Sequence, residues 1–227
     1  MTKKATLGEL ATQYPLATKI FQNYGLDYCC GGNNSLEEAC REKQLSPDQV
    51  LAEIAKEDAS EDRRIQWNEQ PVGELIDYIL TRYHAPLREE IPRLVALAAK
   101  VEQVHADKKD CPKGLHRHLV AINDAVEGHL AKEEQILFPM IQAGQMHGAC
   151  NPIRVMMLEH EEHGENLRKT RDITHNFFLP SEACSSWREL YRGLEQLEKD
   201  LMDHIHLENN ILFPRAIELE GRPGENG

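Results

Sequence analysis

Four histidines and two glutamates are spaced so that they could bind metal ions together. The pattern H-x-x-x-E occurs twice, beginning at His129 and at His204. Residues four apart lie on one face of an α-helix, one turn from each other. Neutral imidazole is the commonest metal ligand, and inward-facing carboxylates complete many bundle metal sites. The predicted ligands are His84, His129, Glu133, His160, His204 and Glu208.

The context of the two pairs matters more than their number, because 11 His and 38 acidic residues would produce such pairs by chance. HLAKEEQILFP begins at His129 and HIHLENNILFP begins at His204, so both pairs lead into Ile-Leu-Phe-Pro. A further histidine precedes each pair at a similar distance: 45 residues separate His84 from His129, and 44 separate His160 from His204. The sequence therefore predicts two copies of one helical hairpin.

Each half of this repeat has enough ligands for one ion and leaves a carboxylate able to bridge to the other half. We therefore predict two iron ions per chain, bridged by carboxylates and by an oxo or hydroxo group when oxidised. Four imidazoles and two carboxylates without a thiolate favour iron, ahead of manganese. Zinc would also bind, but structural zinc sites normally close with four ligands and often use Cys. The alternative without metal is a set of core histidines bonded to neighbouring carboxylates.

The elements that must hold these residues are helices. Apolar residues recur at helical spacing in four long stretches after residue 71, and breakers such as Cys111-Pro112 and Leu179-Pro180 separate them. Four helices with modest connections predict an all-α fold built on an antiparallel four-helix bundle. Each predicted ligand interrupts the apolar face of its helix. A carboxylate buried there without a partner would cost several kcal/mol, which a metal would offset.

The first sixty residues predict a small helical domain. Capping boxes of the S/T-x-x-E/Q type begin at Thr6, Ser35 and Ser46, and each marks the start of a short helix. A charged stretch then predicts a linker. The expected divisions are 1–60 for the small domain, 61–71 for the linker, 72–219 for the bundle and 220–227 for a disordered tail.

Cys29 and Cys30 form a second candidate site, in the loop between Tyr28 and Gly31-Gly32. The small glycines predict that both thiols are accessible. The helix expected after Ser35 would lower the pKa of a nearby thiol. The plainer alternative is that one cysteine is packed and the other incidental. We interpret the cysteines at positions 40, 111, 150 and 184 as ordinary small residues.

Composition excludes several classes of function. The 227 residues carry 26 Lys and Arg against 38 Asp and Glu, a formal net charge of −12. This balance repels nucleic-acid phosphates and anionic lipids, so we expect neither as a partner. No apolar run approaches the length that spans a bilayer, and the N-terminal residues lack the apolar core of a signal peptide. We expect a cytoplasmic protein with reduced thiols, because two adjacent cysteines suit a disulfide framework badly.

Other polar residues receive plainer interpretations. Glu159 and Asp203 each precede a predicted ligand and point about 100° away from it, which favours a solvated or interhelical charge over a role beside the metal. Pro86, two residues after His84, predicts a kink in its helix. Seven histidines without a counterpart in the repeat are expected on the surface or at helix ends: His105, His116, His118, His147, His163, His175 and His206.

At the predicted ligands the chain resembles the haemerythrin-like superfamily, whose fold is an antiparallel four-helix bundle around a carboxylate-bridged di-iron site. It departs from haemerythrin proper in two ways. Gly164 stands where that family has the second histidine of H-x-x-x-H, and the last pair is H-x-x-x-E instead of H-x-x-x-x-D. One histidine fewer opens a coordination position, which argues against simple oxygen carriage.

Over almost its full length the chain more closely resembles the iron–sulfur cluster repair family (the YtfE/ScdA type, also called repair of iron centres). The resemblance rests on residues 26–32, 82–84, 132–139 and 207–210. It implies a cytosolic stress protein that helps restore clusters damaged by nitric oxide or oxidants, with iron–sulfur proteins as partners. It implies that the six residues named above are the metal ligands, and that Cys29 and Cys30 have a redox or iron-handling role.

Three functions share these ligands and stay open at this point. The first is cluster repair by delivery of iron or electrons, which the resemblance favours and which need not be conventional enzyme catalysis. The second is a sensor or scavenger of nitric oxide or oxygen. The third is a di-iron oxidase, peroxidase or nitric oxide reductase. A monomer and a homodimer are equally compatible with the sequence.

Overall fold

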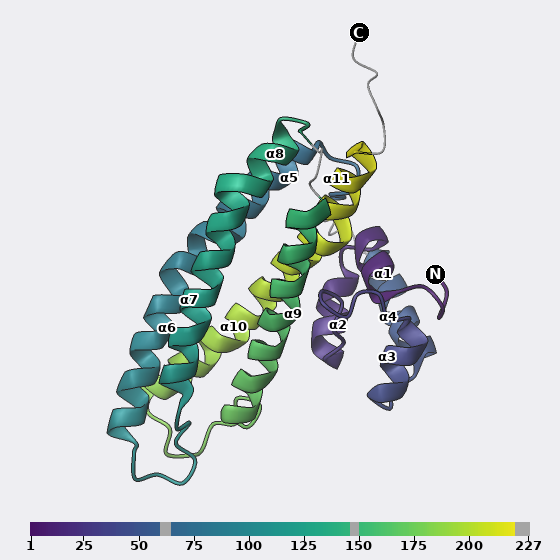
Figure 1. Cartoon of the computed structure of the whole chain (residues 1–227). Coiled ribbons are helices and arrows are strands. Elements are labelled where there is room, and N and C mark those ends of the chain that lie inside the picture. Colours follow the sequence, from purple (N-terminus) through teal and green to yellow (C-terminus); the bar gives the residue numbers. More distant parts are fainter. Residues whose placement is uncertain (60–64, 146–149, 221–227) are drawn as a thin grey trace.

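The computed structural model describes residues 1–59, 65–145 and 150–220, and it is built from helices (Figure 1). Within these ranges the β-pairing is limited to one isolated bridge between Thr6 and Ser35. Four long helical stretches form an elongated bundle, and four short helices form a smaller body beside it. The predicted all-α fold, a bundle with a small N-terminal helical part, is therefore confirmed.

The smaller body contains α1 (Leu7–Gln13), α2 (Ala17–Tyr24), α3 (Leu36–Glu42) and α4 (Pro47–Asp58). The side chains of Thr6, Ser35 and Ser46 each accept a hydrogen bond from the backbone N–H three residues later, so the three predicted helix starts are confirmed. Helix α2 is the one that the sequence did not predict. Its N-cap is Leu16, whose side chain makes no capping bond and therefore leaves no signal.

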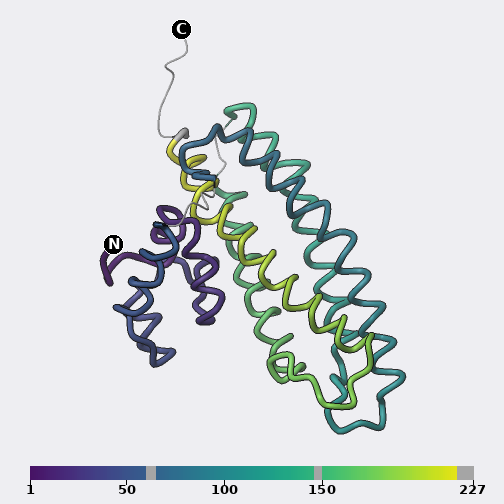
Figure 2. Tube along the Cα trace, turned by 180° about the vertical axis from the view of Figure 1, so that it is seen from behind, coloured from purple at the N-terminus to yellow at the C-terminus, as the bar shows by residue number. Residues whose placement is uncertain are grey.

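Each long stretch of the bundle runs opposite to the next one along the chain (Figure 2). The stretches are α5 (Val72–Ile79), η1 (Leu80–His84) and α6 (Ala85–Val104); α7 (Leu115–Lys132), η2 (Glu133–Leu137) and α8 (Phe138–Gln142); α9 (Cys150–Ile173); and α10 (Ser185–Leu207), η3 (Glu208–Leu212) and α11 (Phe213–Glu220). Helix α6 packs against α7 and α10, and α7 packs against α9. Leu94, Leu119 and Leu190 are fully buried in the apolar core between them.

Three of the four stretches contain a π-turn, in which a backbone N–H bonds to the carbonyl five residues earlier. These bonds run from Ala85 to Leu80, from Phe138 to Glu133 and from Phe213 to Glu208. A proline is the second residue of each helix that follows, at positions 86, 139 and 214. Proline lacks the N–H of a regular helix and crowds the preceding turn, so the wider turn accommodates it. Where the sequence predicts a kink at Pro86, the structure has the π-turn η1 directly before it, and π-turns occur often at functional sites.

Hydrogen bonds join the loop after α2 to the bundle. The Tyr28 hydroxyl donates to Asp203 Oδ1 at 2.6 Å, and Asn210 Nδ2 donates to the carbonyl oxygen of Tyr28 at 3.1 Å. Cys30 Sγ donates to the carbonyl oxygen of His160 at 3.0 Å. The cysteine-containing loop therefore lies directly against the helices that carry predicted ligands.

Some predictions fall outside the part of the chain that the structure describes. These are the end of the small domain and the start of the linker at 60–64, His147, and the tail at 221–227. The domain divisions stay predictions for this reason. Among the described residues, no helix combines the length and the apolar character needed to cross a bilayer.

Candidate metal centre

The six predicted ligands come from all four long stretches and meet inside the bundle. Three lie at π-turns: His84 is the last residue of η1, and Glu133 and Glu208 are the first residues of η2 and η3. The other three, His129, His160 and His204, lie on α7, α9 and α10. All six side chains are buried, with no more than 2% of any of them exposed.

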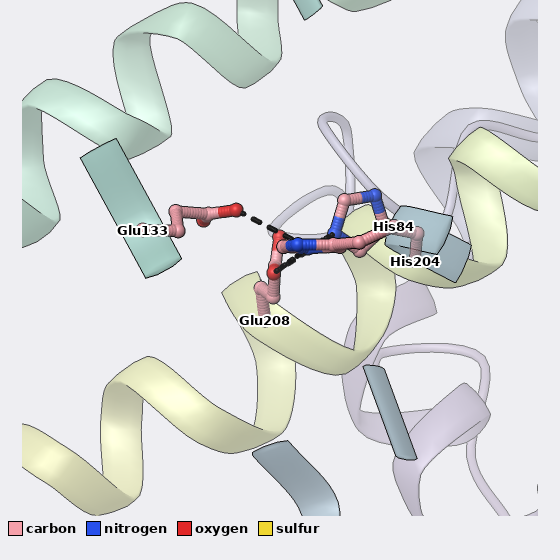
Figure 3. A group of neighbouring side chains, drawn as sticks. All are labelled: His84, Glu133, His204 and Glu208. Atoms are coloured by element: carbon pink, nitrogen blue, oxygen red, sulfur yellow. Dashed lines mark hydrogen bonds and ion pairs between the residues drawn. The ribbon is translucent and has the colours of Figure 1, made fainter. Parts of the chain in front are cut away.

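The ligand atoms fall into two overlapping groups of four, within each of which they lie less than 4.8 Å from one another. The groups are His84, Glu133, His204 and Glu208, and His129, Glu133, His160 and Glu208. Figure 3 shows the first group, with the Glu133 carboxylate facing the two imidazoles and Glu208. Each group takes one histidine from each half of the repeat, so the predicted assignment of one half to one ion is wrong.

Three of the imidazoles are held by a hydrogen bond from Nδ1, the ring nitrogen turned away from Glu133 and Glu208. The bonds run from His84 to Glu134 Oε1 at 2.9 Å, from His129 to Glu159 Oε2 at 2.9 Å, and from His160 to Asn209 Oδ1 at 2.8 Å. Carboxylate and amide oxygens only accept, so Nδ1 carries the proton and Nε2 keeps its lone pair. Metal-binding histidines are commonly oriented in this way.

The resulting donor set fits a bound cation. His129 and His160 both carry their proton on Nδ1, yet their Nε2 atoms lie 3.0 Å apart. Two lone pairs so close repel each other, and a cation between them would replace the repulsion by attraction. Among the described residues, neither carboxylate oxygen of Glu133 has a hydrogen-bond partner. A buried carboxylate is costly unless it is paired or bound to a metal.

Burial and the short distances between the ligands also set the protonation of the site in the absence of metal. Burial and the neighbouring Glu208 carboxylate raise the pKa of Glu133 well above its usual range. Burial also disfavours the charged form of Glu208, but His204 and His160 outweigh it and hold the pKa of Glu208 well below its usual range. Burial lowers the pKa of His129 and of His204, which keeps both rings neutral, the form that binds metal.

Sequence reasoning missed the residues that hold the imidazoles in place. Glu134 directly follows Glu133 and Asn209 directly follows Glu208, so the repeat that identifies the ligands also contains this signal. Glu159 does more than carry a solvated or interhelical charge, because it accepts from His129 as well as from Lys132. Its position directly before His160 is compatible with this role, but does not reveal that its partner is His129.

Four of the histidines expected on the surface or at helix ends are instead buried: His105, His118, His163 and His206. Of these, His105 does end a helix, as the C-cap of α6, and His206 lies in the last turn of α10. The His163 ring packs edge-on against His129, with ring centroids 5.0 Å apart. Burial lowers the pKa of both His163 and His206 to about 4. His163 lies three residues after His160, so helical spacing could have placed it on the inner face.

The two predicted thiols differ from expectation. Cys29 is buried and Cys30 is half-buried, so the expected accessibility is wrong for Cys29. Their sulfur atoms lie 3.7 Å apart without a disulfide. The bond to Cys30 and burial raise the pKa of Cys29 well above its usual range, so the expected lowering is wrong for Cys29. Asp27 Oδ1 accepts from the backbone N–H groups of Cys29, Cys30 and Gly31, which closes the loop tightly.

Cys30 occupies the space beside Gly164 on α9. A Cβ atom at Gly164 would lie 3.1 Å from Cys30 Sγ, a tight contact. The position where haemerythrin proper has a histidine is therefore covered by a thiol from the smaller body. This thiol donates to the backbone carbonyl oxygen of His160.

Comparison with known proteins agrees with this architecture. Residues 75–216 match a family model described as the hemerythrin HHE cation binding domain. Residues 3–58 match a model named ScdA_N and described as a domain of unknown function. Similar curated proteins include those named iron-sulfur cluster repair protein YtfE from Escherichia coli O157:H7, Escherichia coli O8 strain IAI1 and Shigella boydii serotype 4 strain Sb227. Each is 47% identical over 211 residues, which cover 93% of this chain and 96% of the relative.

Proposed function

The chain belongs to the YtfE family of iron–sulfur cluster repair proteins, and from this membership we propose that it is a di-iron protein that helps repair iron–sulfur clusters damaged by oxidative and nitrosative stress. One observation carries the proposal. The two groups of buried ligand atoms share both Glu133 and Glu208, as two neighbouring ions bridged by carboxylates would require.

In this proposal His84 and His204 hold one ion, His129 and His160 hold the other, and both glutamates bridge them. Bound iron supplies one-electron redox chemistry and can take a small ligand such as nitric oxide or oxygen. The chain itself positions the donors. Glu134, Glu159 and Asn209 accept the Nδ1 protons of His84, His129 and His160, so these three imidazoles stay turned towards the centre.

Cys29 and Cys30 would handle iron or electrons between the centre and the damaged cluster. The contact of Cys30 Sγ with the His160 carbonyl supports this role, because it brings the thiol pair against a ligand-bearing helix. Asp27, Cys29 and Cys30 also form a small group of potential metal ligands of their own. The partners would be iron–sulfur proteins with damaged clusters, met in the cytoplasm, and the protein would act as a repair factor and not as a conventional enzyme.

Metal analysis of anaerobically purified protein tests the metal-binding part. We expect about two iron ions per chain and an oxo-bridge absorption on oxidation. The variant Glu133→Leu/Glu208→Leu should lose both. Glu89→Leu/Glu195→Leu, which replaces two exposed glutamates, should keep both. One zinc ion, or no metal at all, in the wild type would overturn the proposal.

Recovery of a cluster enzyme inactivated by nitric oxide tests the repair part. Wild-type protein should restore its activity, and Cys29→Ala/Cys30→Ala should restore much less. Cys111→Ala/Cys184→Ala, which changes two cysteines far along the chain, is the matched control. Full recovery with the first variant would remove the thiols from the proposal. A reversible nitric oxide adduct with no recovery of the enzyme would instead favour a sensor or scavenger.

A further inference from the structure

A row of aromatic rings leads from the candidate metal centre to the protein surface. The Tyr83 ring stacks on the His204 imidazole, with centroids 5.7 Å apart and 15° between the planes. Tyr78 packs edge-on against Tyr83 at 5.9 Å, and Trp67 packs against Tyr78 at 4.5 Å. Tyr83 is buried, and Tyr78 and Trp67 are half-buried. Contacts of this kind are ordinary for aromatic pairs, but here they form a continuous line.

The other ligand imidazoles pack against rings of a different kind. The pairs are His84 on Phe138, His160 on Phe213 and His129 on His163. Phenylalanine has no hydroxyl group and is much harder to oxidise than tyrosine or tryptophan. Within the described residues, the row through Tyr83 is the one set of ring contacts that joins a predicted ligand to partly exposed, oxidisable side chains.

We propose that Tyr83, Tyr78 and Trp67 form a relay that carries single oxidising equivalents from the metal centre to the surface, where an external thiol is oxidised. This activity goes beyond repair and rests on the proposed iron centre. It would protect the buried ligands during oxidative stress, because an oxidising equivalent formed inside the bundle would leave it without attacking an imidazole.

The chemistry of the relay balances. Iron held by the six ligands would supply one electron to hydrogen peroxide. The Tyr83 hydroxyl supplies a hydrogen atom, one electron with one proton, so that the peroxide O–O bond breaks to give hydroxide and water. Tyr83 regains a hydrogen atom from Tyr78, and Tyr78 regains one from the Trp67 indole. An external thiol restores Trp67 with its own hydrogen atom and becomes a thiyl radical.

Two local features favour the relay. The Arg82 guanidinium lies 4.9 Å from the centre of the Tyr83 ring and disfavours a positive charge on it. Tyr78 and Trp67 also line a cavity of about 390 Å³, through which a small thiol can reach the outer rings.

The test uses the iron-loaded full chain treated with hydrogen peroxide in the absence of thiol. Peptide mass spectrometry measures oxygen addition at each tryptophan, and electron paramagnetic resonance detects tyrosyl and tryptophanyl radicals. The chain has two tryptophans, and Trp187 is fully buried, so it serves as the internal control. We expect oxygen addition at Trp67, little at Trp187, and suppression of both the radical signal and the modification by added thiol.

Tyr78→Phe interrupts the row while keeping its packing. It should lose most of the Trp67 modification, with iron content and optical spectrum unchanged. Tyr24→Phe, whose hydroxyl bonds to Glu53 in the smaller body, should behave as wild type. Equal Trp67 oxidation in Tyr78→Phe, or in metal-free protein, would show direct attack by peroxide and overturn the relay. Iron analysis of the same samples separates the two proposals: without iron both fail, whereas with iron but no dependence on Tyr78 only the relay fails.

Discussion

A carboxylate outside the ligand set holds the His84 imidazole. Glu134 Oε1 accepts from His84 Nδ1 at 2.9 Å and from Arg88 Nη1 at 2.7 Å. Glu134→Gln replaces this charged acceptor by a neutral amide, so the ring is held less firmly and becomes a weaker ligand. We expect metal affinity to fall about 10- to 100-fold, measured by competition with a chelator. Glu127→Gln is the control, because Glu127 bonds to Arg88 but not to His84. Unchanged affinity in Glu134→Gln would contradict this role.

His206 links stability to pH. Its pKa is about 4 in the folded protein, lowered by burial, against 6.5 when unfolded. At pH values between these two, the unfolded chain therefore binds more protons than the folded one. The contribution of His206 to stability is complete above pH 6.5 and is lost as the pH drops towards 4. The full contribution of His206 to the free energy of unfolding is about 3 kcal/mol.

Urea unfolding at a series of pH values measures this link. His206→Gln should reduce the slope between pH 6.5 and 4, because this side chain no longer titrates, whereas His163, whose pKa is also lowered to about 4, still does. His175→Gln, which changes an exposed histidine, should keep the wild-type slope. An unchanged slope in His206→Gln would mean that other groups carry the acid sensitivity.

At the scale of the element, the segment Ile-Leu-Phe-Pro serves the same purpose in both halves. It follows the glutamate that begins η2 or η3, and its proline is accommodated by the π-turn. Its phenylalanine then stacks on the first histidine of the same half, Phe138 on His84 and Phe213 on His160. One short motif therefore orients a carboxylate and supports an imidazole on the neighbouring helix.

Removing the extra residue of a π-turn should displace the carboxylate that it positions. Ile136 lies in η2 with an exposed side chain, so its deletion costs little core packing. A regular helix would then rotate Glu133 by about 100° relative to α8. We expect loss of bound metal with helix content retained, measured by metal analysis and far-ultraviolet circular dichroism. Ile136→Ala keeps the chain length and should keep the metal. Normal metal content after the deletion would refute a positioning role for η2.

At the scale of the whole molecule, close packing at Gly8 joins the smaller body to η3. A Cβ atom at Gly8 would lie 2.4 Å from Asn210 Oδ1. The Asn210 side chain has little freedom to move, because its Nδ2 donates to the Tyr28 carbonyl and to His206 Nδ1. Gly8→Ala should therefore loosen the contact between the two bodies.

Alkylation of Cys30 reports on this loosening, since its sulfur lies against the His160 carbonyl in the intact contact. We expect Cys30 to react faster in Gly8→Ala than in wild type, followed by mass spectrometry of the labelled peptide. Gly73→Ala adds the same methyl group where nothing lies within 4 Å, and it should react as wild type does. Equal rates in all three proteins would show that the contact tolerates the added carbon.

The sequence by itself determined the helical fold, three of the four short N-terminal helices and the six side chains that converge in the bundle. These features depend on local signals: capping residues, apolar spacing along one helix, and a repeat that places His129 and His204 in equivalent positions. Helix α2 was not predicted, because no side chain caps its start. The bonds of Glu134 and Asn209 lie within the same repeat and could have been inferred from it.

Only the tertiary structure decided how these parts combine. It pairs His84 with His204 and His129 with His160, buries Cys29 and places Cys30 against α9. Each of these facts depends on which helices become neighbours, and residues more than a hundred positions apart in the chain meet there. Periodicity tells which face of a helix is buried, but not which side chain of another helix it will meet, because that choice depends on the packing of all the helices at once.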